Sequence, residues 1–194
     1  MNSQNQRLKK ASIIDDVIDD FQPKCVIVPY YGRKGRPVSL GNKFKPSKTK
    51  HKPSLRIYCP DMRETLGLTL VLTDPDAPER DNSKLSEYCH WIGIVIGLSS
   101  SDELGQYFDL DAVVDHDWVE NEVVEYQAPN PPPKTGYHRY VFVLLEGDTS
   151  NLTAPSDRKH WGMGKGGRGV REWAKQEGLA VIGANWFIEK NKKQ

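Results

Sequence analysis

Hydrophobic and polar positions along the chain mostly follow the period of two that is typical of β-strands. LTLVLT over residues 68–73 alternates leucine with threonine and valine, which predicts a strand. HWIGIVIG over residues 90–97 and HRYVFVLLEG over residues 138–147 are nearly continuous apolar runs, and such runs indicate central strands buried on both faces. Shorter predicted strands lie in CVIVPYY, SLRIYCP, NEVVEYQA and, near the end of the chain, LAVIGANWFIEK.

Helical spacing appears only towards the two ends of the chain. ASIIDDVIDDF over residues 11–21 has apolar residues on one face, acids on the other and Ser12 as a cap, which predicts an amphipathic helix. VREWAKQEG over residues 170–178 predicts a short helix that Gly178 ends. Because strands and helices do not alternate regularly, we expect a mostly β fold, an antiparallel β-sandwich with short peripheral helices near both ends.

The length and composition indicate one soluble domain. The 194 residues fit an N-terminal arm with a short helix over residues 1–22 and a single domain over residues 23–194. The longest apolar run, WIGIVIGL, is about half of what a bilayer span requires, and the first ten residues contain no apolar signal region. We therefore expect a cytoplasmic protein that can also enter the nucleus by diffusion. The three cysteines are odd in number and lack metal-like spacing, so we expect free buried thiols.

The net charge of +1 gives no overall attraction to nucleic acid or membranes, but charge is unevenly distributed. Residues 33–52 contain eight Lys or Arg and no acid, whereas residues 102–125 contain nine Asp or Glu. We interpret the basic segment as a solvated loop, with weak contact to a membrane surface as its functional alternative. Aromatic residues are sparse within it, so we expect no nucleic-acid partner. GMGKGG over residues 162–167 is interpreted as a turn, since no strand precedes it as a nucleotide-binding loop would require.

The segment DPDAP over residues 74–78 carries the first candidate chemistry. Its two prolines restrict the backbone, so Asp74 and Asp76 are held rigidly at the end of a strand. His90 and His138 each lie at the start of another predicted strand. Neighbouring antiparallel strands can bring such ends together, which favours a shared pocket over four separate structural residues.

Three kinds of site fit two aspartates and two histidines. One is a mononuclear metal site. Another is an acid–base centre in which an aspartate orients a histidine. The third is an anion pocket, in which carboxylates favour protonated histidines that bind a phosphate. The residues alone leave all three open, beside the simpler interpretation that the aspartates cap loop amides.

Two longer segments resemble the signature regions of a known family. LVLTDPDAPER followed by SEYCHWIGIVI, and APNPPPKTGYHRYVFVLLE, are similar to the signatures of the phosphatidylethanolamine-binding proteins. The strong part of this resemblance covers about residues 60–146. SLGN, DRKHWG, REWAK and the tail further resemble the fungal branch that contains the carboxypeptidase Y inhibitor.

The resemblance implies a β-sandwich with a small, metal-free anion pocket and no cofactor. By motif, the pocket residues are Asp74, Asp76, Pro78, Tyr88, His90, Pro133, His138, Tyr140 and Phe187. The implied function is non-enzymatic: binding of phosphate or a phosphorylated head group, and regulation of a protease or of a protein in a kinase or GTPase pathway. The alternative is inhibition of a serine protease of the carboxypeptidase Y type, and a weaker one is an Asp/His hydrolase or metalloenzyme.

Overall fold

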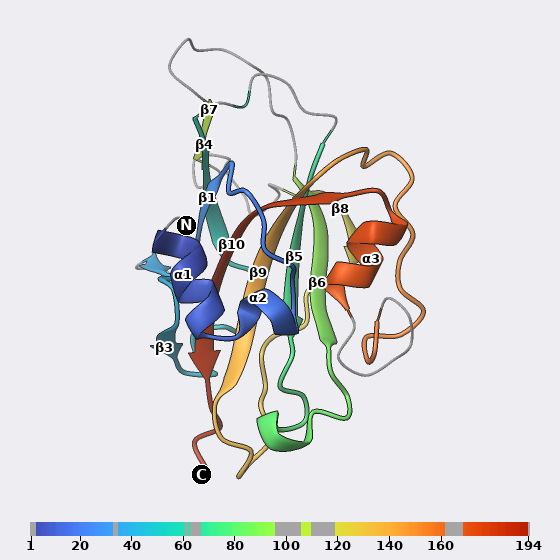
Figure 1. Cartoon of the computed structure of the whole chain (residues 1–194). Coiled ribbons are helices and arrows are strands. Elements are labelled where there is room, and N and C mark those ends of the chain that lie inside the picture. The colour runs from blue at the N-terminus through green and yellow to red at the C-terminus, as the bar shows by residue number, and fades with distance from the viewer. Residues whose placement is uncertain are drawn as a thin grey trace.

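Two β-sheets form the body of the protein (Figure 1). This computed structural model describes residues 3–32, 35–60, 62, 67–95, 106–109, 119–161 and 169–193. One sheet has the order β2-β1-β4-β7 and the other the order β3-β10-β9-β5-β6-β8. The strands are β1 (Val26–Tyr31), β2 (Arg36–Pro37), β3 (Asn42–Phe44), β4 (Ser54–Cys59), β5 (Leu68–Asp74), β6 (Tyr88–Val95), β7 (Gln106–Asp109), β8 (Val119–Val124), β9 (His138–Glu146) and β10 (Ala180–Glu189). The predicted mostly β sandwich is confirmed.

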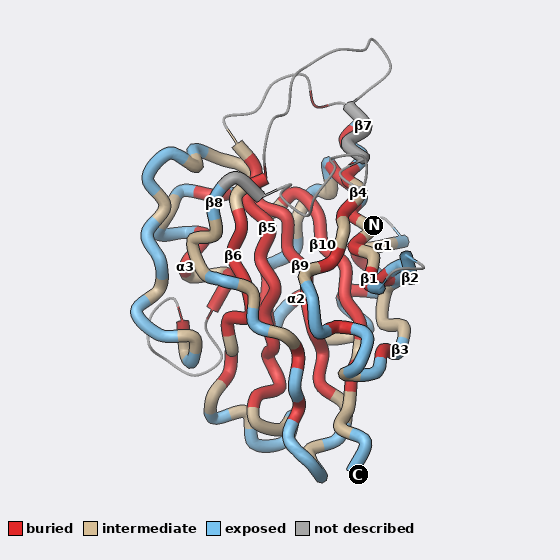
Figure 2. The backbone as a smooth tube through the Cα atoms, turned by 180° about the vertical axis from the view of Figure 1, so that it is seen from behind, coloured by how far each residue is buried: buried red, intermediate tan, exposed pale blue. Residues whose placement is uncertain are grey.

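The larger sheet is buried on both faces, as the apolar runs predict. Every residue of β5 is buried, and so are nearly all residues of β6 and β9 (Figure 2). Leu70, Phe142 and Phe187 pack against the small sheet, whereas Val71, Val143 and Trp186 belong to a second core on the opposite face. Each apolar face therefore has its own covering layer, which explains why these strands do not alternate in polarity.

Three short helices cover the second face of the large sheet (Figure 1). They are α1 (Ser3–Lys10), α2 (Ile13–Asp16) and α3 (Val170–Gln176), and a 3₁₀ turn, η1 (Arg80–Asn82), lies between β5 and β6. The third confirms the helix predicted around residues 170–178. In the part of the chain that the structure describes, no helix is long and apolar enough to cross a membrane.

The single helix predicted over residues 11–21 is wrong. The structure has α1 before this segment and only the four-residue α2 within it. Ser12 and Asp15 adopt positive φ angles of 55° and 93°, which interrupt a right-handed helix. The apolar side chains of the segment, such as Ile13 and Ile18, are nevertheless fully buried against the sheet. The pattern identified a buried face correctly, but the backbone reaches that face through irregular turns.

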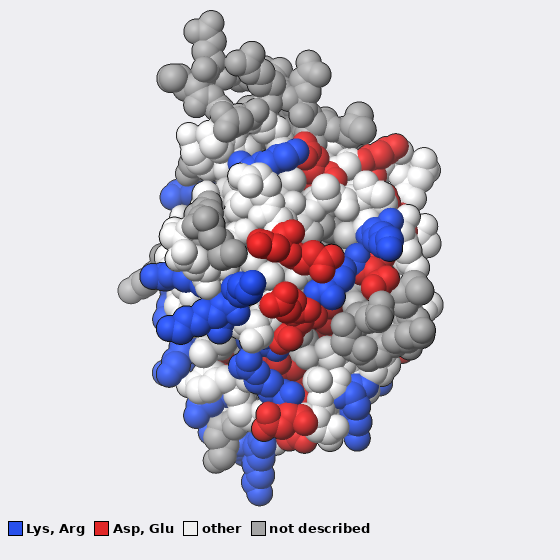
Figure 3. Space-filling view, in the orientation of Figure 1, with Lys and Arg blue, Asp and Glu red and all other residues white. Residues whose placement is uncertain are grey.

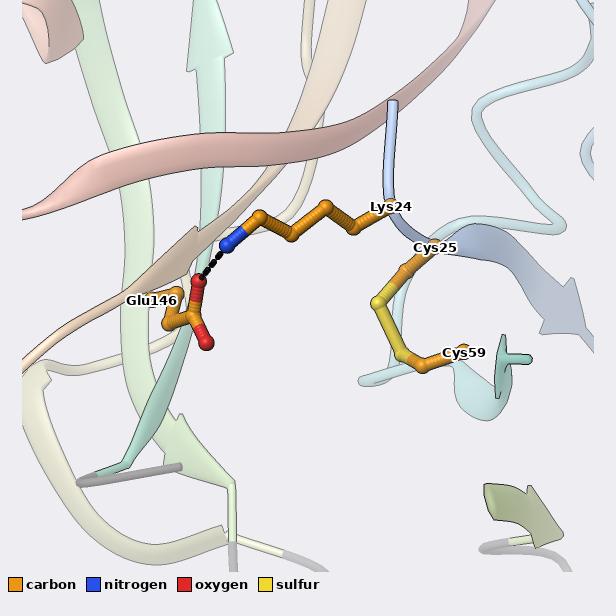
Figure 4. Close-up of a disulfide and its surroundings, with 4 residues drawn as sticks. All are labelled: Lys24, Cys25, Cys59 and Glu146. Atoms are coloured by element: carbon orange, nitrogen blue, oxygen red, sulfur yellow. Dashed lines mark hydrogen bonds and ion pairs between the residues drawn. A yellow bond between two sulfur atoms is a disulfide. The ribbon is translucent and has the colours of Figure 1, made fainter. Parts of the chain in front are cut away.

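The expectation of three free thiols is also wrong, because Cys25 and Cys59 form a disulfide (Figure 4). The two residues flank the antiparallel pairing of β1 with β4, which aligns Val26 with Tyr58 and so places the cysteines opposite each other. Cys25 and Cys59 are 34 residues apart in the sequence, and this spacing does not indicate that they pair. The third cysteine, Cys89, is free and buried.

One strand pair departs from the antiparallel pattern and bears on the site. β3 runs parallel to the last part of β10, with Asn42 opposite Phe187 and Phe44 opposite Glu189. The lysine-rich segment after β3 is thereby brought to the end of the sheet where β10 stops. The glycine-rich segment over residues 162–167 lies outside the described residues.

Candidate anion-binding site

The candidate residues come together at one end of the large sheet. β5 ends at Asp74, β6 starts at Tyr88 and β9 starts at His138. Register aligns Thr73 with Cys89 on one side and with Val141 on the other, so the three strand ends are neighbours. Antiparallel pairing thus joins residues that lie up to 64 positions apart in the chain.

His138 and Asp74 form a buried pair at the centre of this end. Nδ1 of His138 lies 2.8 Å from Oδ2 of Asp74, and the two side chains are 1% and 5% exposed. Nε2 of His138 lies 2.9 Å from Oγ1 of Thr135, which donates its own proton to the carbonyl of Pro132. Both ring nitrogens therefore face acceptors, an arrangement that suits the doubly protonated imidazolium.

The pKa of His138 agrees with this geometry. Burial alone would lower it, but the hydrogen bond with Asp74 and the negative charges of Asp74 and Asp76 outweigh burial, and the pKa lies above its ordinary value. When it is protonated, His138 has both of its N–H groups in use. It contributes positive potential to the site rather than a free donor.

His90 is turned towards the same space by a β-bulge. Leu72 pairs with Trp91 and Thr73 pairs with Cys89, so His90 is the extra residue between them. Trp91 packs between the two sheets, and the His90 ring contacts Tyr140 of that same layer at 5.3 Å between ring centroids. Without the bulge, consecutive residues would face opposite sides of the sheet.

His90 differs from His138 in its protonation. Its Nδ1 lies 2.8 Å from the carbonyl oxygen of Gln127, which can only accept, so Nδ1 carries the proton in the neutral ring. Burial is the main cause that lowers the pKa of His90, and the charge of Asp74 opposes it only in part. Nε2 of His90 makes no hydrogen bond to any residue that the structure describes. This nitrogen is the group left for a ligand.

Aromatic rings form the wall around the two histidines. Tyr88 lies 5.1 Å from His90 between ring centroids, and Tyr140 stacks 6.3 Å from His138. Phe187 of β10 stacks on Tyr140 at 5.2 Å and closes the inner side. The carboxylate of Asp74 contributes to raising the pKa of Tyr140, after burial, so its hydroxyl stays protonated. The wall is apolar apart from this group and the hydroxyl of Tyr88.

Asp76 lies in the same turn as Asp74 but binds a different partner. Arg139 donates to it from its backbone nitrogen at 2.8 Å and from Nη2 at 2.7 Å. Nη1 of Arg139 in turn donates to the carbonyls of Ala11 and Ser12. Asp76 therefore anchors the N-terminal segment through Arg139, whereas Asp74 hydrogen-bonds to His138 and its charge acts on His90. Sequence reasoning missed this role of Arg139, although it stands next to His138 in the motif.

Glu189 is a second residue that sequence reasoning missed. It pairs with His138 across β10 and β9, is fully buried, and accepts a hydrogen bond from Thr49 at 2.8 Å. Burial raises its pKa to about 7. Glu189 lies two positions after Phe187 in the same strand. This spacing could have indicated that both side chains face the space between the sheets.

The remaining predicted residues lie at the edge of the site. Pro78 is half-buried in the turn after Asp76, and Pro133 is exposed in its loop, where Pro131 is the buried proline. Cys89 points to the helix-covered face, and burial raises its pKa to about 12. Within the described ranges, no three His, Cys, Asp or Glu side chains are grouped so that they could hold a metal ion.

Comparison with known proteins identifies the family. The family model of the phosphatidylethanolamine-binding proteins matches residues 26–187, which include every described strand of both sheets apart from the last two residues of β10. The chain belongs to the phosphatidylethanolamine-binding protein family. The resemblance stated from the signature segments is thereby confirmed.

Individual members of the family are similar along most of the chain. Carboxypeptidase Y inhibitor of Saccharomyces cerevisiae is 32% identical, over 95% of this chain and 93% of the yeast protein. Protein FLOWERING LOCUS T of Arabidopsis thaliana is 33% identical, over 70% of this chain and 65% of the plant protein. A crystal structure of carboxypeptidase Y inhibitor complexed with its cognate proteinase superimposes with a TM-score of 0.82 at 31% identity, covering 98% of this chain and 96% of the inhibitor.

Proposed function

We propose that this protein is a non-enzymatic binding protein that takes phosphate or a phosphorylated head group at His90 and His138 and regulates a protein partner. The observation that carries the proposal is the buried pair of His138 and Asp74 beside a second histidine whose Nε2 is open to a ligand. An anion placed against Nε2 of His90 would lie in the positive potential of His138. The aromatic wall excludes water and so strengthens that attraction.

Anion binding must be linked to protonation of His90. The neutral ring offers only a lone pair at Nε2, because Nδ1–H is directed at the carbonyl of Gln127. A bound anion favours the protonated ring, which can donate from Nε2. Burial lowers the pKa of His90 in the free protein, so a bound anion must raise this pKa for the ring to become protonated. Binding therefore becomes stronger as the pH falls.

We expect the affinity for sulfate to rise at least about tenfold between about pH 8 and about pH 5.5. Sulfate is the probe because it is tetrahedral like phosphate and does not itself titrate in this range. The measurement is isothermal titration calorimetry at constant ionic strength. The variant His90→Asn should remove most of the pH dependence.

The exposed His51 provides a matched control. His51→Asn removes a histidine outside the site and should leave both the affinity and its pH dependence unchanged. Equal affinity of the native protein at both ends of the pH range would contradict the proposal, and so would a His90→Asn variant that behaves like the native chain.

A second candidate function is inhibition of a serine carboxypeptidase. It is favoured by the similarity to carboxypeptidase Y inhibitor, which extends over 98% of this chain and therefore includes the N-terminal segment. That segment is fastened to the domain by Leu8 and Ile13, both fully buried, and by Arg139. It would thus be presented to a protease as part of a rigid surface.

We expect the intact chain to inhibit carboxypeptidase Y in a concentration-dependent way, as measured by hydrolysis of a chromogenic peptide substrate. A serine endopeptidase serves as the specificity control and should remain active. Removing residues 1–22 is a poor test, since it would expose the core that Leu8 and Ile13 cover. The absence of inhibition by the intact, folded chain would exclude this candidate and leave the anion site untouched.

A further inference from the structure

The start of β6, where His90 lies, extends past the end of its neighbouring strand. β8 ends at Val124, which pairs with Ile92, so the ladder between the two strands does not reach His90. On the other side, the bulge at His90 interrupts the pairing with β5. A buried carbonyl without a hydrogen bond is costly. The backbone carbonyls around the bulge therefore need donors from elsewhere in the chain.

Arg158 supplies these donors from a distant segment. Its Nη1 donates to the carbonyl of Cys89 at 3.1 Å and to the carbonyl of His90 at 3.3 Å. Its Nη2 donates at 2.8 Å to the carbonyl of Glu125, which directly follows β8. The backbone carbonyl of Arg158 in turn accepts a hydrogen bond from the nitrogen of Cys89 at 2.7 Å. One residue thus joins the bulge to the strand end beside it.

The same strand end holds the ring of His90. The backbone nitrogen of Gln127 donates to the carbonyl of His90 at 2.8 Å, and the carbonyl of Gln127 lies 2.8 Å from Nδ1 of His90. The hydrogen bond at Nδ1 decides which ring nitrogen carries the proton in the neutral ring. Arg158 binds His90 itself and also Glu125, two residues before Gln127. It therefore fixes both partners of this hydrogen bond.

The guanidinium of Arg158 is directed at backbone carbonyls and not at a carboxylate. On the face that Figure 3 shows, basic and acidic side chains lie side by side at several points, and elsewhere in the chain Arg171 pairs with Asp19 at 3.2 Å. Arg158 has no ion-pair partner among the residues that the structure describes. Its charge therefore acts on His90, whose pKa is lowered mainly by burial and further by this guanidinium.

We propose that Arg158 is a positioning residue of the anion site, which fastens the bulge to the strand end at residues 125–127 and so holds His90 with Nε2 free for the ligand. The inference rests on the proposed function, in which Nε2 of His90 receives the anion. A guanidinium suits this role because its donors stand in a rigid, planar fork that can bind three carbonyls at once. Arg158 acts through His90 and Gln127 and makes no contact with the ligand itself.

Other charged and titratable groups also face the ring of His90. They are Tyr88 of β6, Asp74 of β5, and His138 and Tyr140 of β9. Beside the effect of burial, the charge of Asp74 raises the pKa of His90, and the charge of His138 lowers it. All four groups remain when Arg158 is replaced. A change in the behaviour of His90 can then be attributed to Arg158.

The test is the tautomer of His90 in the full chain, read from two-bond nitrogen–proton correlation NMR spectra at about pH 8 without sulfate. His90→Asn identifies the signal. Arg158→Met removes the charge and the donors, whereas Arg158→Lys keeps the charge but loses the fork. The control Arg171→Met changes the net charge equally and removes an arginine that also donates to a backbone carbonyl, that of Asp15.

We expect a single tautomer, with the proton on Nδ1, in the native protein and in Arg171→Met. Both Arg158 variants should show a mixture of the two tautomers, because the Gln127 carbonyl is no longer held against the ring. Denaturant unfolding checks that the variants are folded, and Arg158→Lys carries the test if Arg158→Met does not fold. An unchanged single tautomer in the folded Arg158 variants would overturn the proposal, and so would equal mixing in Arg171→Met.

Sulfate affinity gives a second readout. Arg158→Met should weaken sulfate binding at about pH 5.5 by about tenfold, the equivalent of about one hydrogen bond to a charged group. The midpoint of the pH dependence should move to higher pH, because a charge that lowers the pKa of His90 is removed. Arg158→Lys should also bind more weakly but keep a midpoint near that of the native protein. Native affinity and an unchanged midpoint in Arg158→Met would contradict the positioning role.

The two readouts separate this inference from the proposed function. If the native protein binds no sulfate while the tautomer of His90 still depends on Arg158, the anion site is wrong and the effect of Arg158 on His90 stands. If the native protein binds sulfate with the expected pH dependence while both Arg158 variants behave like it, the anion site stands and the role of Arg158 is wrong.

Discussion

Replacing Arg139 by leucine is expected to lower the free energy of unfolding by about 3–5 kcal/mol, because it leaves the carboxylate of Asp76 buried without a cation. Asp76 is 1% exposed and Arg139 is 5% exposed. The guanidinium donates to both oxygens of Asp76 and also to the carbonyls of Ala11 and Ser12. The measurement is chemical denaturation at neutral pH.

A double-mutant cycle isolates the charge. Asp76→Asn combined with Arg139→Leu should be more stable than Arg139→Leu alone, because the amide removes the unpaired charge. Arg80→Leu, at an exposed arginine of the 3₁₀ turn, should change the stability by less than about 0.5 kcal/mol. The explanation fails if the double variant is no more stable than the single one.

Loss of Arg139 should also loosen the N-terminal segment. Ser12 and Asp15 hold positive φ angles, and the carbonyls of Ala11 and Ser12 are fixed by the guanidinium. Limited proteolysis of Arg139→Leu under native conditions should therefore cut first within residues 11–18. The same residues should remain protected in Arg80→Leu.

The second large effect is expected at Glu87, as a dependence of stability on pH. Glu87 is buried, and burial is the main cause that raises its pKa from 4.5 to about 8. Between these values the unfolded chain has the ionised carboxylate while the folded chain keeps the proton, so stability falls as the pH rises. Above about pH 8 both states are ionised and the loss is complete. At about 1.4 kcal/mol per pKa unit, the loss is at most about 5 kcal/mol.

Glu87→Gln should remove this loss. The amide keeps an oxygen for the hydrogen bond from Thr73, which donates to Glu87 at 2.9 Å, and it cannot ionise. We expect the variant and the native protein to be equally stable near pH 5 and the variant to be more stable at about pH 8. The measurement is denaturant unfolding across this range.

Glu125 is exposed and provides the control, since Glu125→Gln should follow the native pH dependence. The difference between Glu87→Gln and the native chain isolates Glu87 from other buried groups that titrate in the same range. One such group is Glu189, whose pKa burial raises to about 7. Parallel curves for Glu87→Gln and the native protein would refute the assignment.

The central strands were predictable because strands buried on both faces have a simple sequence pattern, a short run of apolar residues. The runs at residues 68–73, 90–97 and 138–147 became β5, β6 and β9, within two residues at each end. A strand between two apolar layers needs apolar side chains on both faces, and short apolar runs are typical of such strands. The helix predicted over residues 11–21 failed because its apolar spacing is also satisfied by turns that hydrogen-bond to Arg139.

The candidate site was predictable as a set of residues but not as an arrangement. Asp74, His90 and His138 were identified from their positions at strand ends, and the structure places them together. The different roles of Asp74 and Asp76 were not predictable, since the two residues stand in one short motif. Their partners, His138 and Arg139, are adjacent in sequence and point to opposite faces of β9, so strand geometry separates the two pairs.

Local chemistry in the chain was enough to indicate a mostly β protein, its central strands and a cluster of carboxylates and imidazoles, because periodicity and residue type are local properties. The disulfide between Cys25 and Cys59, the bulge that turns His90 inwards, and the contacts of Arg158 with this bulge depend on register between distant strands. Register is set by the packing of the whole sheet and cannot be predicted from any single segment. For that reason the protonation of each histidine and the contacts around them followed only from the folded chain.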